Sequence, residues 1–172
     1  MQVLRHALAI LVLPFTMVVL VPRWLLSSSW SRGDTRWDSA VSLAWLPRIA
    51  GVALIVAGFA LFAWCISLFA RVGKGTLAPW DPTRNLVAAG PYRHLRNPMI
   101  TGVVTMLAGL ALFYGSRVLA AWAGIFFAFN HVYFVLVEER ELAFRFGRAY
   151  ETYKATVPRW LPTLRNRGQT DA

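Results

Sequence analysis

Four long apolar runs constrain this chain more than any other feature of its sequence. They cover residues 3–21, 49–70, 98–114 and 118–137. An α-helix needs roughly 17–25 mostly apolar residues to cross a bilayer, and each run has that length. Only 15% of the 172 residues are charged, whereas a soluble domain carries about a quarter. The sequence therefore predicts an all-α integral membrane protein, a single domain of residues 1–172 with about four transmembrane helices.

The last two runs are separated only by Gly115-Ser116-Arg117. So short a connection predicts an antiparallel hairpin of helices. After residue 137, apolar residues recur at helical spacing among charged ones, which predicts a cytoplasmic amphipathic helix that Pro158 ends. The recurring residues are Leu142, Phe146, Tyr150 and Tyr153. Trp160, just beyond this helix, is expected to dock on the membrane.

The formal net charge is +10, and most basic residues gather on one side of the predicted spans. They lie in the loop of residues 71–97 and in the tail after residue 137. Under the positive-inside rule, both termini and this loop are cytoplasmic, and residues 22–47 form an outer loop. Because the charges flank apolar runs, they indicate a lipid bilayer as partner and no nucleic acid. With Cys65 as the single cysteine, neither an intrachain disulfide nor a metal site is expected.

A polar, basic loop leads into the third run and ends in Asn97-Pro98. Asparagine favours the N-cap and proline the first helical position, so this pair predicts a helix start. A helix start leaves N–H groups unpaired and carries partial positive charge, which suits a carboxylate or phosphate. Gly90-Pro91 predicts a tight turn just upstream. The alternative is an ordinary membrane-entry loop with positive-inside charges.

Glu138 and Glu139 lie where the fourth run leaves the bilayer, on the same surface as the loop before Asn97. Acidic residues are unusual at such an exit and favour a paired role. Together with the helix start they predict a pocket of opposed polarity that suits a zwitterion, such as an amino-acid moiety. The alternative is a solvated helix turn with salt bridges to Arg93 or Arg96.

His131 lies two turns before Glu138 on the same helix face, so it is a candidate site residue within the fourth run. A histidine hydrogen-bonded between helices would explain the same position. Four glycines in the apolar runs are expected to serve helix packing. They are Gly51, Gly58, Gly102 and Gly109.

Four motifs in order resemble the isoprenylcysteine carboxyl methyltransferase family and, more distantly, the phospholipid N-methyltransferases. They are Gly-Pro-Tyr-Arg-x-x-Arg-Asn-Pro-x-x-x-Gly at 90–102, Glu-Glu-x-x-Leu at 138–142, Phe-Gly-x-x-Tyr-x-x-Tyr at 146–153 and Val-Pro-Arg-Trp-Leu-Pro at 157–162. The resemblance covers roughly residues 84–162. The chain departs from the family's usual His-Pro at Asn97-Pro98, from its tyrosine at Ile100 and from an acceptor-binding arginine at Phe134. The last departure puts prenylcysteine esterification in doubt.

The resemblance implies an S-adenosylmethionine-dependent membrane methyltransferase, with residues 71–172 as the cofactor-binding half and residues 1–70 contributing the first two spans. The cofactor would enter from the cytoplasm and a lipophilic acceptor from the bilayer. Matched by position, the cofactor contacts are Arg84, Asn85, Leu86, Val87, Gly90, Tyr92, Asn97, Pro98, Met99, Ile100 and Glu138.

The acceptor could be a carboxylate, a thiol or an amine, and only an amine needs a base. His131 or Glu139 is then the candidate catalytic base. Two other functions remain open: an NADPH-dependent membrane reductase similar to the sterol reductases, whose tail motif is alike, and a non-catalytic scaffold or binding subunit. The acceptor's identity and the oligomeric state do not follow from the sequence.

Overall fold

A computed structural model of the chain describes residues 14–31, 34, 45–73 and 85–161. Within these residues all regular structure is helical, which confirms the predicted all-α class. Most of the first apolar run, part of the outer loop and the predicted cofactor contact Arg84 lie outside the described residues.

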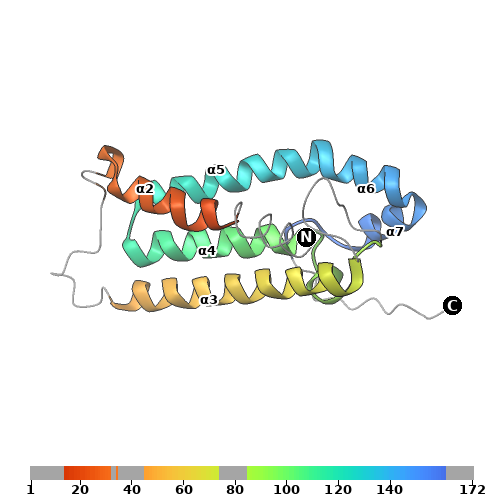
Figure 1. The fold of residues 1–172 in the computed structure, drawn as a ribbon, viewed down its shortest axis with the longest axis horizontal. Helices are drawn as coiled ribbons and strands as arrows, with labels where there is room; N and C mark the ends of the chain where they lie inside the picture. The colour runs from red at the N-terminus through yellow and green to blue at the C-terminus, as the bar shows by residue number, and fades with distance from the viewer. Residues whose placement is uncertain (1–13, 32–33, 35–44, 74–84, 162–172) are drawn as a thin grey trace, which may run out of the picture.

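The fold is a bundle of helices that run along the long axis of the molecule (Figure 1). Helix α3 (Trp45–Leu68) packs against α4 (Pro98–Tyr114), and α4 packs against α5 (Arg117–Tyr133). The short α2 (Val21–Ser27) follows a π-helical turn at Thr16–Leu20 and contacts α5. The chain reverses direction between α3 and α4 and again between α4 and α5, so the predicted hairpin of the last two runs is confirmed.

Among the residues that the structure describes, two helices are long and apolar enough to cross a membrane, not clearly four. They are the continuous stretches Trp45–Gly73 and Arg117–Phe146, and the apolar helices Thr16–Ser27 and Pro98–Tyr114 are shorter. Helix α4 ends after 17 residues, which span about 25 Å against a hydrocarbon core of about 30 Å. The predicted outer loop of residues 22–47 is also shorter than expected, because the helix continues through Ser27 and α3 begins at Trp45.

The outer faces of the two long helices carry large apolar side chains that no other part of the described structure covers. On α3 they include Val56, Phe59 and Trp64, and on α5 they include Ile125 and Phe129. Soluble domains rarely expose so much contiguous apolar surface. These faces therefore suit contact with lipid.

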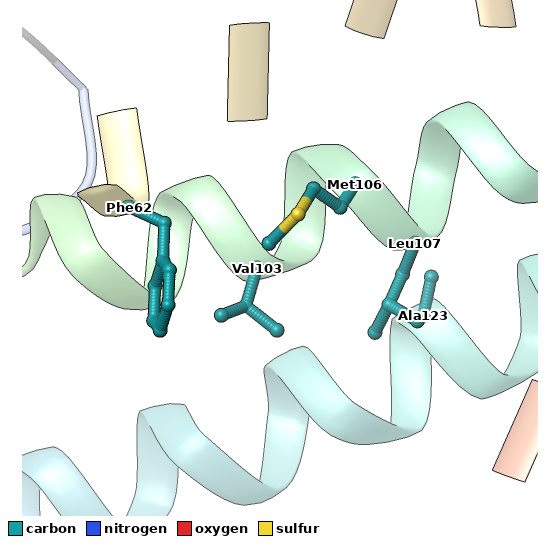
Figure 2. Packing of buried hydrophobic residues seen from close by; sticks show 5 residues of the cluster. All are labelled: Phe62, Val103, Met106, Leu107 and Ala123. Atoms are coloured by element: carbon teal, nitrogen blue, oxygen red, sulfur yellow. The ribbon is translucent and has the colours of Figure 1, made fainter. Parts of the chain in front are cut away.

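The core lies between α3, α4 and α5. Figure 2 shows the five buried residues of its largest cluster, which are Phe62, Val103, Met106, Leu107 and Ala123. Helices α3 and α4 approach most closely at two pairs of glycines. A Cβ atom at Gly58 would lie 2.5 Å from the carbonyl oxygen of Gly102, and one at Gly51 would lie 2.7 Å from that of Gly109. The predicted packing role of these glycines is confirmed.

The turn between α4 and α5 is held by a residue far away in the sequence. Gly115 ends α4 in the left-handed conformation, with φ 63°. The hydroxyl of Ser116 donates to the Asp34 carboxylate and accepts a hydrogen bond from Leu119 N at 3.2 Å. Arg117 N also donates to Asp34 Oδ1 at 2.9 Å. The Asp34 side chain, 1% exposed, thus caps the start of α5.

We expect Asp34→Ala to lower the free energy of unfolding by about 1 kcal/mol, the usual contribution of a helix cap. Burial raises the pKa of the Asp34 carboxyl, but hydrogen bonds from Ser116, Arg117 and Val118 and the charge of Arg117 outweigh it, so the pKa lies below 3.8. A lowered folded-state pKa gives stability that is present above about pH 4 and lost as the pH falls through the folded value. Thermal denaturation in detergent between pH 3 and 7 measures both effects. Asp34→Asn should remove the acid-side loss, and an unchanged pH profile in that variant would contradict the assignment.

The predicted amphipathic tail helix is two helices. A π-helical turn at Phe134–Glu138 carries α5 directly into α6 (Glu139–Phe146), and α7 (Arg148–Thr156) follows. Gly147 separates them, with φ 50° and ψ −127°. Residues that have a Cβ atom rarely adopt this conformation. Because the chain turns there, Tyr150 and the residues after it fold back toward the bundle.

Candidate functional site

Three segments meet at the end of the bundle where α4 begins and α5 runs into α6 (Figure 1). They are the loop of residues 85–97, the pair Glu138 and Glu139, and the tail at residues 157–160. Arg96, next to the start of α4, donates from Nη1 to Glu139 Oε1 at 2.7 Å. The start of α4 at Asn97-Pro98, which we call the Asn-Pro corner, and the glutamate pair therefore share one surface. A site formed by both requires this.

Glu139 is enclosed by basic side chains. Arg159 donates from Nε to Oε1 at 2.7 Å and from Nη2 to Oε2 at 3.2 Å. Lys154 Nζ lies 3.8 Å from Oε2. With Arg96 also bound, the Glu139 side chain is only 6% exposed. The salt bridge to Arg96, considered from the sequence as the alternative to a ligand site, is thus present for Glu139.

Glu138 differs from its neighbour. It lies in the π-helical turn before α6 and is partly exposed. Among the described residues, every ion pair at this end of the bundle goes to Glu139 and none to Glu138. The Glu138 carboxylate is therefore the one of the pair that could accept a ligand's ammonium group.

The predicted cofactor contacts in the loop hold it against α3 and the π-helical turn Phe69–Gly73 that continues it. The Asn85 side chain donates to the carbonyl oxygen of Val72 at 3.1 Å. Val87 and Tyr92 are buried beside Cys65, and Leu86 is partly buried. Gly90 has φ 56°, and a Cβ there would lie 3.0 Å from a methyl carbon of Leu68. Burial raises the pKa of Tyr92 well above its ordinary value, so the phenol stays neutral.

Helix α4 starts at Pro98, as the Asn97-Pro98 pair predicted. Asn97 occupies the N-cap position and is buried, but its side chain forms no cap hydrogen bond. Its carbonyl oxygen accepts instead from the Thr101 hydroxyl at 3.0 Å. Met99 and Ile100, the other predicted contacts, are partly buried in the first turn. Their N–H groups precede the first intrahelical donors, so this end of α4 keeps its capacity for an anion.

His131 is bonded to the tail. Trp160 donates from Nε1 to His131 Nδ1 at 2.8 Å. The indole ring also contacts Phe127 and Phe134, with centroids 5.0 and 6.0 Å away. Trp160, which the sequence predicts to dock on the membrane, packs against α5. Phe134, which stands where the resembling family has an acceptor-binding arginine, is part of this aromatic cluster.

Tail residues complete the site, and their part in it could not be inferred from the sequence. Tyr153 donates its hydroxyl to the carbonyl oxygen of Tyr92 at 2.7 Å. Tyr150 is fully buried beside Arg96, and within the described residues neither the Tyr150 hydroxyl nor Arg96 Nε meets hydrogen-bond geometry with a partner. Burial raises the pKa of Tyr150 and of Tyr153, so both stay neutral. The helical spacing of the two tyrosines signalled a packed face but not the loop against which they pack.

Residues 46–149 match the model of the phospholipid methyltransferase family. They include α3, the site loop, α4, α5, both glutamates and α6. The apolar helices and this match thus define a helical membrane protein of a methyltransferase family. The chain belongs to the phospholipid methyltransferase family. No curated protein and no solved structure matches it.

Proposed function

We propose that this protein transfers a methyl group from S-adenosylmethionine to a lipophilic acceptor held in the bilayer. Family membership supports methyl transfer in a membrane. One observation carries the assignment of the site: the 2.7 Å contact between Arg96 and Glu139 brings the start of α4 beside Glu138. A helix N-terminus and a carboxylate that forms no ion pair within the described residues then share one surface, which we assign to the cytoplasmic side.

The donor and acceptor groups at this end fit the cofactor. Its methionine part carries an ammonium and a carboxylate, which need opposite partners. Glu138 supplies a carboxylate for the ammonium. The first turn of α4, from Pro98, supplies N–H groups and partial positive charge for the carboxylate. The Tyr150 hydroxyl and Arg96 Nε, which form no hydrogen bond within the described residues, are further buried polar atoms beside this surface.

The remaining predicted contacts form the wall of the site. Asn85, Val87, Gly90 and Tyr92 hold the loop on α3 and so set the position of Asn97. We assign Arg84 to the same wall from the family resemblance.

When bound, the cofactor supplies a methyl group already activated by a sulfonium. The protein therefore has to align the acceptor with that group and keep water away. Alignment of two reactants can lower a barrier by several kcal/mol. The exposed apolar faces of α3 and α5 suit an acceptor that enters from the lipid, and a carboxylate, a thiol or an amine all remain compatible with them.

We expect Glu138→Gln to weaken S-adenosylmethionine binding at least about tenfold, because the ammonium loses its counter-charge while the side-chain shape is kept; tenfold corresponds to about 1.4 kcal/mol. Titration of the detergent-purified protein by calorimetry measures the dissociation constant. Glu151→Gln, an exposed glutamate on α7, is the matched control and should bind like the wild type. Equal affinity in the two variants would remove Glu138 from the site.

The reaction is tested by incubation with methyl-labelled S-adenosylmethionine and a membrane lipid extract. Label in a lipid product supports the proposal, and the identity of that product settles the acceptor class. Protection against heat by NADPH but not by S-adenosylmethionine would favour a reductase instead. Protection by neither would favour a non-catalytic role.

A further inference from the structure

Three consecutive tail residues each bond to a different part of the site. Pro158 accepts a hydrogen bond through its carbonyl oxygen from Arg96 N at 2.9 Å. Arg159 binds Glu139, and Trp160 binds His131. These residues, which we call the tail strap (Pro158–Trp160), lie beyond the segment that matches the family. They connect the loop before α4 with both α5 and α6.

The hydrogen bond from Trp160 determines which nitrogen of His131 carries the proton. An indole N–H can only donate, so His131 Nδ1 must accept. The neutral ring then holds its proton on Nε2. Neither nitrogen is free to take a proton, since Nε2 already has one and Nδ1 would lose the bond to Trp160 on gaining one. Proton abstraction by His131 would therefore release the tail strap.

The same reasoning applies to Glu139. Both of its oxygens accept hydrogen bonds from Arg159, and Oε1 also accepts from Arg96. Protonation of Glu139 would remove the negative charge that binds Arg96 and Arg159. The Arg96 side chain is only 9% exposed. The two residues that the sequence suggested as bases are thus the two acceptors for the tail strap.

We propose that His131 and Glu139 are positioning residues: they anchor the tail strap, which in turn holds Arg96 and the start of α4. The proposal rests on the proposed function for its catalytic meaning. The chain of contacts has a definite order. Trp160 and Arg159 bind α5 and α6, Pro158 binds the Arg96 amide, and Arg96 immediately precedes the Asn97-Pro98 corner. Loss of the Trp160 hydrogen bond should therefore increase the mobility of the Asn97-Pro98 segment, although Trp160 does not contact it.

Four variants separate an anchor from a base. His131→Asn keeps an acceptor near the position of Nδ1 but cannot act as a base. His131→Leu removes the acceptor, Trp160→Phe removes the donor while keeping an aromatic ring, and the fourth variant combines the last two. Hydrogen–deuterium exchange of a peptide containing Arg96 measures the strap directly. Calorimetry with S-adenosylmethionine and methyl transfer to lipid extract measure its effect on the site.

For an anchor, His131→Leu and Trp160→Phe should speed exchange at the Arg96 amide by about threefold to tenfold, the effect of one lost hydrogen bond. The double variant should exchange no faster than either single one, because both remove the same bond. Cofactor affinity and methyl transfer should fall in parallel, and His131→Asn should restore most of what His131→Leu loses.

Two results would overturn the proposal. In the first, His131→Asn and His131→Leu are equally inactive while exchange stays as in the wild type, which is the pattern of a base. In the second, exchange at Arg96 is unchanged in every variant. If instead the wild type neither binds nor uses S-adenosylmethionine, the proposed function fails, while the exchange data still decide whether the strap exists.

Discussion

Gly58→Ala is expected to lower the thermal stability of the protein more than any other single methyl addition to its helices. The new Cβ would lie 2.5 Å from the Gly102 carbonyl oxygen and 2.8 Å from Met106 N. Both are backbone atoms of α4, so no side-chain rotation can relieve the contact and the two helices must separate. Overpacking of this kind costs about 1–3 kcal/mol. A larger residue such as leucine should prevent the pairing of α3 with α4.

The midpoint of thermal denaturation in one fixed detergent measures this effect. Gly124→Ala is the matched control, because a Cβ atom at that position of α5 meets nothing within 4 Å. Gly102→Ala, which addresses the same contact from α4, should resemble Gly58→Ala. If Gly58→Ala and Gly124→Ala melt together, the close approach of α3 and α4 is wrong. Cofactor affinity should also fall in Gly58→Ala, since α4 carries the Asn97-Pro98 corner.

The second large effect is expected at Glu139. Glu139→Leu should lower the free energy of unfolding by about 3 kcal/mol, because removing one member of a buried ion pair leaves its partners uncompensated. Arg96 would bear most of this cost, since its side chain is almost fully buried. Arg159 is more exposed and Lys154 lies 3.8 Å away, so both can turn to water.

Thermal denaturation with and without Arg96→Leu measures the coupling between the two residues. The double variant should be less destabilised than the sum of the single variants, because it buries no unpaired charge. Glu141→Gln, an exposed neighbour on the same helix, should leave stability within about 0.5 kcal/mol of the wild type. Additive losses from Glu139→Leu and Arg96→Leu would contradict the pairing.

Much of the bundle follows from patterns confined to one helix or one turn. The apolar runs predict the helices, the three-residue connection predicts the hairpin of α4 and α5, and Asn97-Pro98 predicts where α4 begins. Each signal depends on residues within a few positions of one another, and so it survives without knowledge of the fold. The glycines of α3 and α4 also belong here, since small residues in apolar helices mark close packing. The bounds of α4 also follow, since it covers the whole third run and Gly115, in the left-handed conformation, ends it.

The sequence by itself determined the helical class, the family motifs and the placement of the loop and the glutamate pair on one surface. Only the tertiary structure decided which glutamate is paired, which atom of His131 is occupied and where the tail returns. The reason is the separation of the partners along the chain: 43 residues between Arg96 and Glu139, 29 between His131 and Trp160 and 82 between Asp34 and Ser116. No local pattern encodes such pairs, because each forms only after Gly147 or a bundle turn has brought its members together.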